Sequence, residues 1–598
     1  MLEDALRRHW GFSTFKPLQR EAAEAALAGR DALFVLPTGG GKSLCYQLPA
    51  AAAQGLVVVV SPLIALMDDQ VAAAREAGLA ADALHSNVES ADRGKAYARL
   101  ASGETRLLYV SPERLLVGDL VEDLAPRVTL AAVDEAHCVS HWGHDFRPEY
   151  RRLLEIFDRW PKAARMALTA TATPAVRGDI RSQLGLRDPL ELVGHPDRPN
   201  LVFRAFPRRE QLPQVLEVIR RHPGEAGIVY AQTRKDVDRL AAGLRAEGVS
   251  CAAYHAGLGA DERRRAQEGF VGESIDVVVA TIAFGMGIDR TNVRFVVHAN
   301  TPKSLEHYQQ ESGRAGRDGL AAECVLFFSG ADLVTHRRLA LMDGALPPER
   351  ERVLDRQLRQ IGRFAVSPVC RHRLLCEHFG AAYPAASCGA CDVCLGETRG
   401  LSPEEALLTA KKILSAAWRT EGRFGGGYVA AVLAGKSDER MARHGHDRLN
   451  VFGILKEAGE PAIRSWIDQL VVQGLLEVVD GEYPLLRITD AGKALCRDEG
   501  EVRLGAVAPA AKSRKRTKGK AAAAQGVDGA LFERLRALRL TLARAAGLPP
   551  YVVFHDSTLA EMAAAKPRSL DELRGVKGVG EAKLARYGEA FLKEIAAG

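Results

Sequence analysis

The chain has 598 residues, of which 47% are hydrophobic and 26% are charged, and its formal net charge at pH 7 is +6. This composition excludes an intrinsically disordered protein, and so small a net charge gives no basis for predicting a polyanionic partner. No apolar run approaches the roughly 18 residues of a membrane span, and the first residues are no secretory signal, so we expect a cytoplasmic protein of several domains with reduced cysteines.

Short apolar strands alternate with helical stretches from about residue 31 to residue 330, a pattern typical of parallel α/β sheets. The alternation restarts after Pro199, which predicts two separate lobes. In the first lobe the predicted strands are residues 33–36, 57–61, 107–110, 130–133 and 166–169. In the second lobe they are residues 228–231, 252–255, 277–280, 295–299 and 324–328.

A glycine-rich segment follows the first predicted strand, and residues 36–43 read LPTGGGKS. Glycine backbone N–H groups can approach phosphate oxygens, Lys42 supplies a positive charge, and the Ser43 hydroxyl can bind Mg²⁺. Leu36 stands where the strict P-loop pattern has its first glycine, which indicates a helicase-like variant. The candidate nucleotide-binding residues of this segment are Thr38, Gly39, Gly40, Gly41, Lys42 and Ser43.

An acidic pair, Asp134 and Glu135, follows the predicted strand at residues 130–133. Asp134 would hold Mg²⁺ through water, and Glu135 is placed to orient the attacking water. The alternative is a glycine-rich turn with an unrelated acidic helix start. Two motifs that each follow a strand, in this order, favour a nucleoside triphosphatase in which Lys42, Asp134 and Glu135 are catalytic.

Two arginines, Arg314 and Arg317, lie in the second lobe, which has no P-loop. An arginine from a partner lobe can neutralise the charge that develops on the γ-phosphate, so we consider both residues catalytic candidates. A solvent-exposed basic turn is the alternative. Upstream, residues 280–289 offer close backbone approach to the nucleotide at Gly287, and Asp289 is placed to couple lobe closure to the nucleotide.

Together these motifs resemble those of the RecQ family of superfamily 2 DNA helicases, and the resemblance runs nearly end to end. The segments that carry it are residues 15–19, 36–43, 61–70, 109–113, 134–137, 168–173, 280–289 and 304–319. The resemblance implies an ATP- and Mg²⁺-dependent DNA helicase. Such an enzyme would move 3′ to 5′ along one strand and open forks, junctions and similar intermediates of repair, recombination and replication.

The same resemblance implies an α/β fold with two tandem RecA-like parallel-sheet lobes, followed by a zinc-binding helical subdomain, a winged helix and a small all-α HRDC domain. The expected boundaries are lobe 1 at 1–199, lobe 2 at 200–345, the zinc-binding subdomain at 346–398, the winged-helix (RQC) domain at 399–500, a basic linker at 501–527 and the HRDC domain at 528–598.

Residues 138–150 resemble the aromatic-rich loop of RecQ proteins. Trp142 and Phe146 offer faces for unstacked bases, and Arg147 offers a phosphate or cation–π contact. His141 of the same loop is a further DNA-binding candidate. The alternative is that these aromatic residues form a core between the lobes. Because the loop follows the acidic pair directly, base stacking could reposition the catalytic carboxylate.

Gln19 resembles the glutamine with which the family reads adenine, since a side-chain amide can pair with both N6 and N7 of that base. Lys16 occupies a position where the family usually has an arginine. A compact ammonium group has no planar face, so we do not expect it to stack on the base. Both residues are nucleotide-binding candidates.

Four cysteines, Cys370, Cys388, Cys391 and Cys394, have the spacing C-x17-C-x2-C-x2-C. Closely spaced thiolates are what a structural Zn²⁺ site requires, and four sulfur ligands leave no open position for catalysis. Cys376 lies on a predicted helix after Cys370 and on a different face from it, so we interpret it as a buried thiol. Its substitution for Cys370 as a ligand is the alternative.

Residues 401–498 resemble the RecQ winged helix, a fold that docks on duplex phosphates. The turn at Asp480 and Gly481, with Tyr483 nearby, is a candidate strand-separating wing and DNA contact, although an ordinary hairpin has the same pattern. Residues 506–525 are rich in alanine and basic residues, which predicts a solvated linker with salt-dependent affinity for DNA.

Residues 531–595 resemble the HRDC domain, a helical accessory module. Within it, residues 575–580 read GVKGVG. This run either exposes backbone N–H groups to a phosphate or forms a simple turn between helices, and the sequence does not separate the two interpretations.

The expected cofactors are ATP, Mg²⁺ and Zn²⁺. The expected partners are single-stranded, duplex and junction DNA, with a single-stranded-DNA-binding protein as a candidate, no membrane, and a nucleoid-associated monomer as the working form. An RNA helicase is the first rival, but the aromatic loop, the cysteine cluster and the terminal module favour DNA. A DNA-binding scaffold with a degenerate ATPase is the second, and the intact Lys42, Glu135 and Arg317 argue against it.

Overall fold

The computed structural model describes residues 2–62, 64–140, 147–284, 290–342, 344, 346–479, 485–507 and 528–597. Several predicted features lie outside the described residues. These are His141, Trp142, Phe146, Gly287, Asp289, the turn at Asp480 and Gly481, Tyr483, and most of the predicted basic linker.

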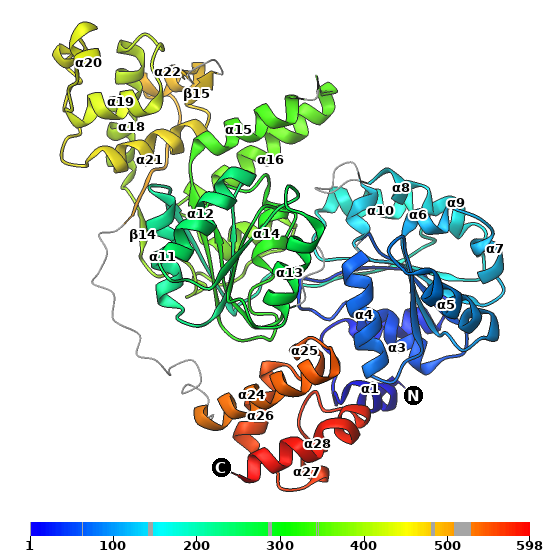
Figure 1. Ribbon diagram of the computed structural model, residues 1–598. Coiled ribbons are helices and arrows are strands. Elements are labelled where there is room, and N and C mark those ends of the chain that lie inside the picture. The colour runs from blue at the N-terminus through cyan, green and yellow to red at the C-terminus, as the bar shows by residue number, and fades with distance from the viewer. Residues whose placement is uncertain are drawn as a thin grey trace.

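The first lobe is built on a seven-stranded parallel sheet with the strand order β3-β4-β2-β5-β6-β1-β7 (Figure 1). Its strands are β1 Ala32–Val35, β2 Leu56–Val60, β3 Ala81–Leu84, β4 Leu107–Val110, β5 Val128–Val133, β6 Ala164–Thr169 and β7 Leu190–Val193. All five strands predicted for this lobe are present, with ends shifted by no more than about two residues. The two that the sequence pattern missed, β3 and β7, are the edges of the sheet.

Both faces of this sheet are buried. Side chains of β2 alternate between the two faces, so that Val58 and Val60 join one apolar cluster while Val57 and Val59 join the other. The helices of the lobe are α1 Leu2–Trp10, α2 Gln19–Leu27, α3 Leu44–Ala52, α4 Ile64–Glu76, α5 Ser90–Ser102, α6 Pro112–Leu115, α7 Leu120–Leu124, η1 Ala136–Val139, α8 Pro148–Arg151, α9 Leu153–Phe157 and α10 Pro174–Gln183.

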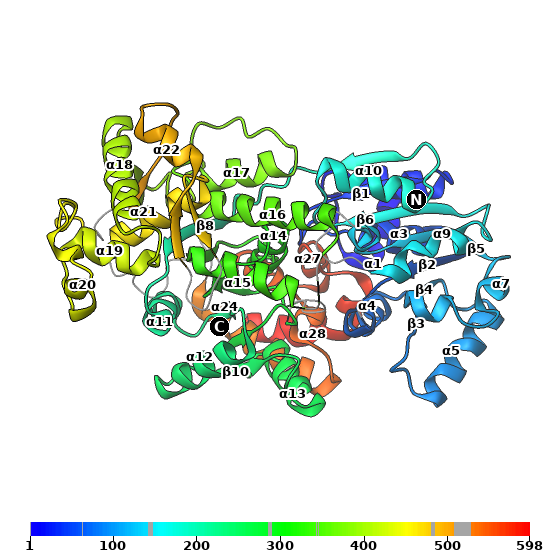
Figure 2. The same ribbon diagram turned by 90° about the horizontal axis from the view of Figure 1, so that it is seen from above.

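The second lobe has a six-stranded parallel sheet with the order β10-β11-β9-β12-β13-β8. Its strands are β8 Leu201–Pro207, β9 Ala226–Tyr230, β10 Cys251–Tyr254, β11 Val277–Ala280, β12 Val293–His298 and β13 Ala322–Phe328. Its helices are α11 Gln211–Arg221, α12 Arg234–Ala246, α13 Ala260–Val271, α14 Leu305–Ser312 and α15 Gly330–Leu341. Figures 1 and 2 show the two lobes side by side, and this architecture confirms the predicted fold class.

The chain continues into a region that packs mainly on the second lobe, while the turn at Gly380 also reaches lobe 1, where a Cβ on that residue would lie 2.9 Å from Pro174 Cγ. Its elements are α16 Pro348–Val366, α17 Arg371–His378, β14 Thr398–Gly400, α18 Pro403–Arg419, α19 Gly426–Ala434, α20 Glu439–Arg443, η2 His446–Arg448, α21 Glu460–Val472, β15 Leu476–Val479, β16 Leu485–Ile488, α22 Asp490–Cys496 and β17 Gly505–Val507. Strands β15 and β16 pair in antiparallel fashion, as a hairpin at this place requires.

The start of the predicted linker differs in the structure. Strand β17 pairs antiparallel with β14, and the side chains of Trp466 and Gln469 both donate hydrogen bonds to the carbonyl of Gly505. The alanine-rich sequence gave no strand signal, because this strand is stabilised by partners far away in the chain. The first residues of the predicted linker, up to Val507, therefore belong to the folded region.

The last helices form a small all-α module that lies against both lobes (Figure 1). They are α24 Gly529–Ala546, α25 Pro550–Val553, α26 Asp556–Ala565, α27 Leu570–Arg574 and α28 Glu581–Ala596. On lobe 1, Arg586 pairs with Glu76. On lobe 2, Arg539 pairs with Glu273 at 2.9 Å.

The glycine run at residues 575–580 lies in this interface. Gly11 of lobe 1 has a φ of +68°, and a Cβ on it would lie 2.3 Å from the carbonyl carbon of Val579. The N–H of Gly578 points to the carbonyl of Gly11 at 3.4 Å. The run therefore lets the backbones of lobe 1 and of the terminal module approach closely.

No described helix of the chain is long and apolar enough to cross a membrane.

Candidate active site and metal centre

The P-loop connects the end of β1 to the start of α3. Gly39 and Gly41 have φ values of +82° and +80°, a conformation that glycine adopts without strain. The Leu36 side chain, which replaces the first glycine of the strict pattern, occupies the space beside Gly40, where a Cβ would lie 2.0 Å from its Cδ2 atom. Lys42 directs its Nζ atom to the Leu36 carbonyl at 3.2 Å. The departure from the strict pattern thus fills a gap behind the loop.

The acidic pair stands at the end of β5, which lies in the middle of the sheet beside β2. The N–H of Asp134 bonds to the carbonyl of Val60 at 2.8 Å, and Glu135 has a left-handed φ of +48°. Burial raises the pKa of the Asp134 carboxyl to about 6, and the neighbouring Glu135 adds to this rise while Lys42 opposes it. Burial also lowers the pKa of Lys42, against the attraction of both carboxylates. The structure thus brings these three predicted residues together.

Residues around the acidic pair connect it to other motifs. His137 Nδ1 lies 3.3 Å from a Glu135 carboxylate oxygen and 3.0 Å from the Thr169 hydroxyl, at the start of the segment 168–173. The Tyr150 hydroxyl donates to the Asp134 carbonyl at 3.3 Å. A shift of His137 would therefore move the Glu135 carboxylate, and a shift of Tyr150 would move the backbone of Asp134.

The aromatic-rich loop is held at both of its ends. The N–H of Arg147 bonds to the carbonyl of Cys138 at 2.9 Å, and its guanidinium donates to the carbonyl of Pro62 at 3.1 Å. This guanidinium therefore contacts lobe 1 itself, a position that the sequence did not suggest. The loop between these ends lies outside the described residues, so its predicted base contacts stay predictions.

The two candidate arginines follow α14 and meet the P-loop from the other lobe. A Cβ on Gly313 would lie 3.0 Å from the Thr38 hydroxyl, and a Cβ on Gly39 would lie 3.5 Å from the Cα atom of Arg317. The charge of Arg317 is also one of those that lower the pKa of Lys42. Arg314 is buried beside it. The second lobe thus reaches the phosphate-binding loop of the first.

Sequence reasoning missed the residues that position this arginine segment. Arg198, in the connection between the lobes, donates hydrogen bonds to the carbonyls of Gly313 at 2.8 Å and Gly316 at 2.5 Å. Asn200 donates to the Gly316 carbonyl at 3.0 Å. Because these two residues belong to no motif and act on backbone carbonyls more than 100 residues away, no local pattern indicates them.

The candidate adenine-binding residues cover the P-loop. Gln19 is buried, accepts a hydrogen bond from the Lys16 N–H at 2.9 Å and donates to the carbonyl of Gly41 at 2.9 Å. The Lys16 ammonium donates to the carbonyl of Gly39 at 2.8 Å. Reading a base with Gln19 would exchange its bonds to the loop for bonds to the base. This links base recognition to the conformation of the phosphate-binding loop.

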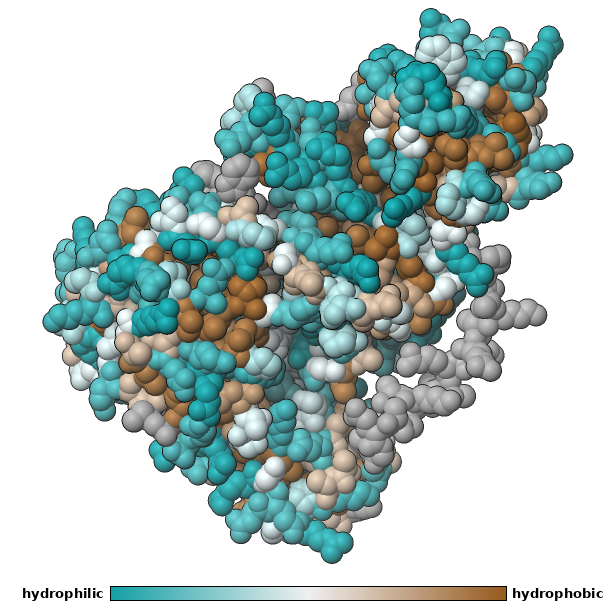
Figure 3. Space-filling model, turned by 180° about the vertical axis from the view of Figure 1, so that it is seen from behind, coloured by the Kyte–Doolittle hydropathy of each residue, from teal (hydrophilic) through white to brown (hydrophobic). Residues whose placement is uncertain are grey.

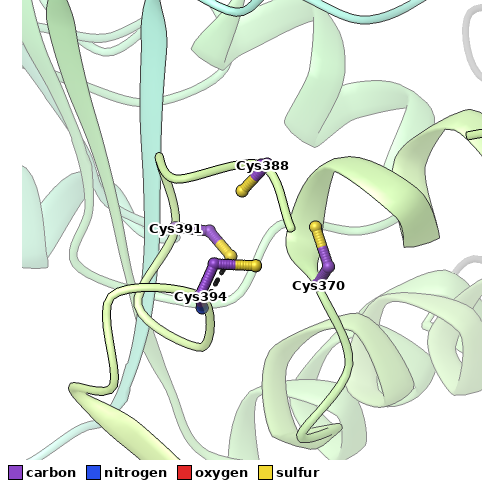
Figure 4. A group of neighbouring side chains, drawn as sticks. All are labelled: Cys370, Cys388, Cys391 and Cys394. Atoms are coloured by element: carbon purple, nitrogen blue, oxygen red, sulfur yellow. Dashed lines mark hydrogen bonds between the residues drawn. The ribbon is translucent and has the colours of Figure 1, made fainter. Parts of the chain in front are cut away.

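The four predicted cysteines converge at a second site, and their sulfur atoms all lie within 4.8 Å of one another (Figure 4). Cys370 precedes α17, and the other three come from the loop before β14. The N–H groups of Ala390 and Cys394 bond to the sulfurs of Cys388 and Cys391 at 3.3 and 3.4 Å. Four convergent thiols with N–H donors to sulfur fit a structural Zn²⁺ ion. Cys376 is buried outside this group, as expected.

A buried ion pair holds the two halves of the cysteine cluster together. Arg371 donates to both carboxylate oxygens of Asp392 at 2.8 Å, and Thr398 donates to the same carboxylate at 2.9 Å. The loop also pairs with the edge strand β8, because Phe203 exchanges backbone hydrogen bonds with Ala390 and Asp392 at 3.0 Å. The cysteine cluster therefore links the second lobe to the region that follows it in the chain.

Comparison with known families matches five consecutive segments of the chain. They are DEAD/DEAH box helicase at residues 16–178, helicase conserved C-terminal domain at 208–319, RecQ zinc-binding at 330–395, RQC domain at 404–513 and HRDC domain at 528–595.

Curated proteins that are similar to the chain over its whole length include two bacterial helicases. The ATP-dependent DNA helicase RecQ of Haemophilus influenzae is 40% identical over 600 residues, which cover 99% of this chain and 95% of that protein. The ATP-dependent DNA helicase RecQ of Bacillus subtilis is 39% identical over 598 residues, which cover 100% of this chain and 98% of that protein.

Proposed function

The chain belongs to the RecQ family of ATP-dependent DNA helicases, and from this premise we propose that it hydrolyses ATP in the cleft between its two lobes and uses the cycle to separate DNA strands. One observation carries the proposal. The arginine segment of lobe 2 lies so close to the P-loop of lobe 1 that a Cβ on Gly313 would lie 3.0 Å from the Thr38 hydroxyl and a Cβ on Gly39 would lie 3.5 Å from the Cα atom of Arg317. A nucleotide held by one lobe would therefore be sensed by the other.

Each site residue has a role that follows from its position. Lys42 and Ser43 would hold the phosphates and Mg²⁺, with the P-loop N–H groups beside them, and Asp134 would hold the ion through water. A bound Mg²⁺ ion would neutralise phosphate charge. Glu135, whose carboxylate lies 3.3 Å from His137 Nδ1, would take up a proton from the attacking water.

The arginines complete the site from lobe 2. Arg317 and Arg314 would stabilise the charge that develops on the transferred phosphoryl group. Arg198 would hold their backbone through the carbonyls of Gly313 and Gly316. After hydrolysis the attraction between these arginines and the phosphate charge would weaken, and the cleft between the lobes could open. Opening and closing of the lobes is the motion that would advance the strand.

The DNA part of the proposal rests on family membership together with the aromatic-rich loop. Arg147, His141, Trp142 and Phe146 would contact the single strand, and the fixed ends of the loop would pass its movement to Asp134 through Tyr150. Movement from 3′ to 5′, preference for forks and junctions, action as a nucleoid-associated monomer, and contact with a single-stranded-DNA-binding protein are proposed from the family alone. The expected domain boundaries are proposed on the same basis.

The four-cysteine cluster would hold one Zn²⁺ ion in a structural role. Zinc would supply a cross-link between the start of α17 and the loop before β14. Because four sulfurs would fill its coordination shell, we assign it no step in the reaction.

ATP hydrolysis with single-stranded DNA or RNA as the stimulating polymer tests the proposal. We expect DNA to raise the rate at least tenfold more than RNA of equal length, and a duplex with a 3′ tail to be unwound while one with a 5′ tail is not. Preferential stimulation by RNA, or unwinding from the 5′ tail, would contradict the proposal. A Lys42→Ala variant serves as the inactive control.

A further inference from the structure

Helix α16 carries a row of four arginines on its solvent face. Arg352, Arg356, Arg359 and Arg363 are all exposed, and their spacing of four, three and four residues places them on one side of the helix. The buried residues of the helix, Leu354, Leu358, Ile361, Phe364 and Ala365, lie on the opposite side. At about 1.5 Å per residue, the row extends over roughly 16 Å.

No acidic side chain of the described residues pairs with this row, and one acid of the helix, the exposed Glu349, lies on the same side, three residues before Arg352. Two acids on the flank of the helix, Glu351 and Asp355, are both paired with Arg337 of α15, at 2.6 and 3.3 Å. Within the part of the chain that the structure describes, none of the four guanidinium groups makes an ion pair or a hydrogen bond. Like charges one helical turn apart repel each other, so this arrangement weakens the isolated helix. A bound polyanion would remove that repulsion.

The position of α16 connects it to the region that resembles a winged helix. The helix packs against α21 of that region and against α15. In Figures 1 and 2 the hairpin of α15 and α16 projects beside the junction of the two lobes, with the winged-helix region on its other side. From behind, the same hairpin forms a strongly hydrophilic projection (Figure 3). Its exposed face is therefore open to a large ligand.

We propose that the arginine face of α16 binds the phosphate backbone of the duplex arm of a DNA substrate. This inference rests on the proposed function, in which the winged-helix region holds duplex DNA next to the motor. Arginine binds phosphates without regard to base sequence, and the row is long enough to follow about five base-pair steps of one strand.

The absence of stacking groups favours a duplex over a single strand. Single-strand grooves combine positive charge with aromatic side chains on which bases stack. The aromatic residue of α16, Phe364, is buried on the opposite face. A purely cationic, straight face matches the regular backbone of a duplex. The row would thus support the duplex arm while the aromatic-rich loop handles the separated strand.

Charge removal at the row tests this proposal through the salt dependence of binding. The variant R352Q/R356Q/R359Q/R363Q keeps good helix formers, because glutamine ranks close to arginine in helix propensity. Its binding to a labelled duplex with a 3′ tail, measured by anisotropy between 50 and 200 mM salt without nucleotide, should show a salt slope smaller by about 2 to 3. Affinity at 100 mM salt should fall at least tenfold.

Two further variants separate charge from structure. R356K/R359K keeps the charge and should retain most of the salt slope, whereas R7Q/R8Q, on α1 at the far side of the molecule in Figure 1, should bind the tailed duplex like the wild type. Thermal unfolding and zinc content of all variants should match the wild type. Because binding is measured without ATP, an inactive motor would not affect the result.

Single-stranded DNA of the same length completes the test. Its affinity should change less than twofold in the fourfold variant. An unchanged salt slope with the tailed duplex would overturn the proposal. An equal loss with the single strand would also overturn it, because the row would then contact the unwound strand. If the fourfold variant kept the salt slope with the tailed duplex but lost binding to poly-glutamate, the arginine face would instead be a binding site for an acidic protein.

Discussion

The two lobes share one fold, but the buried acid at the nucleotide site of lobe 1 and two buried acids in ion-pair networks of lobe 2 have pKa values shifted in opposite directions. In lobe 1, Asp134 stands at the end of a central strand, and burial with a neighbouring carboxylate raises its pKa to about 6. In lobe 2, burial acts in the same direction on Glu323 and Glu306, yet their pKa values fall to about 2, because His222 and two arginines bond to the first and His378 bonds to the second.

This difference separates a site that performs chemistry from sites that hold structure. A buried acid with a raised pKa still lacks part of its counter-charge, which a metal ion can provide. A buried acid with a lowered pKa already has its partners. The first lobe therefore presents the reactive acids, and the second lobe presents arginines to them.

The largest expected effect is in lobe 1. Replacing Lys42 by alanine should lower the ATP hydrolysis rate on the order of 10³-fold, because the phosphates lose the positive charge of the P-loop and the buried Asp134 loses a neighbouring cation. A steady-state phosphate-release assay measures this change. The control is Lys162→Ala, an exposed lysine of the same lobe, which should hydrolyse ATP like the wild type. Comparable hydrolysis rates in both variants would contradict the assignment of the catalytic groups to lobe 1.

Loss of the metal should affect stability far more than catalysis. A Cys391→Ser variant should lose the roughly one zinc ion per chain expected for the wild type and should unfold at a lower temperature, because α17 and the loop before β14 lose their cross-link. Zinc analysis and calorimetry measure the two effects. Cys376→Ser, a buried thiol outside the cluster, should keep its zinc. Zinc loss in this second variant would contradict the ligand assignment.

The paired acids of lobe 2 should appear in the pH dependence of unfolding. The folded-state pKa of Glu323 is about 2, below its ordinary value of 4.5, so its contribution is complete above about pH 4.5 and disappears as the pH falls toward 2. The contribution is about 3 kcal/mol at neutral pH. Glu323→Gln should lower the free energy of unfolding at pH 7 and flatten its slope between pH 4.5 and 2. An unchanged slope would mean that the network does not stabilise the fold.

The docking of the terminal module should respond unequally on the two lobes. Glu273 of lobe 2 binds the buried Arg539, whereas Glu76 of lobe 1 binds Arg586, whose side chain is 52% exposed. Glu273→Gln should therefore lower the free energy of protection against hydrogen exchange in α24 by about 3 kcal/mol. Glu76→Gln should change the same quantity in α28 by under about 1 kcal/mol. Equal effects would show that burial does not decide the strength of this docking.

The sequence was sufficient for the central strands and for the motifs. Central strands of a parallel sheet are apolar on both faces, so β2 and β11 stand out as runs of valine. Of the four edge strands of the two lobes, β10 was predicted, and the other three were missed for physical reasons. Strand β3 contains Asp82, which is buried but paired with Arg75 and Arg99, and β7 and β8 are only half buried.

The candidate sites divide in the same way. Closely spaced residues, such as the P-loop and the last three cysteines, were predicted together and lie together. Motifs from separate segments, such as Lys42 and the acidic pair, were also predicted together, but two contacts made through backbone carbonyls were not predictable. Arg198 acts through backbone carbonyls of another lobe, and Arg147 donates to the Pro62 carbonyl, so neither interaction leaves a pattern in the sequence around it.

The central claim is that a residue of lobe 2 acts on a nucleotide held by lobe 1, and single-stranded-DNA-stimulated ATP hydrolysis by an Arg317→Ala variant tests it most directly. The account predicts that ATP still binds with an affinity within about tenfold of the wild type, while the stimulated rate falls on the order of 10²-fold or more. Arg265→Ala, an exposed arginine of the same lobe, should leave the rate unchanged. A wild-type rate in Arg317→Ala would contradict the account.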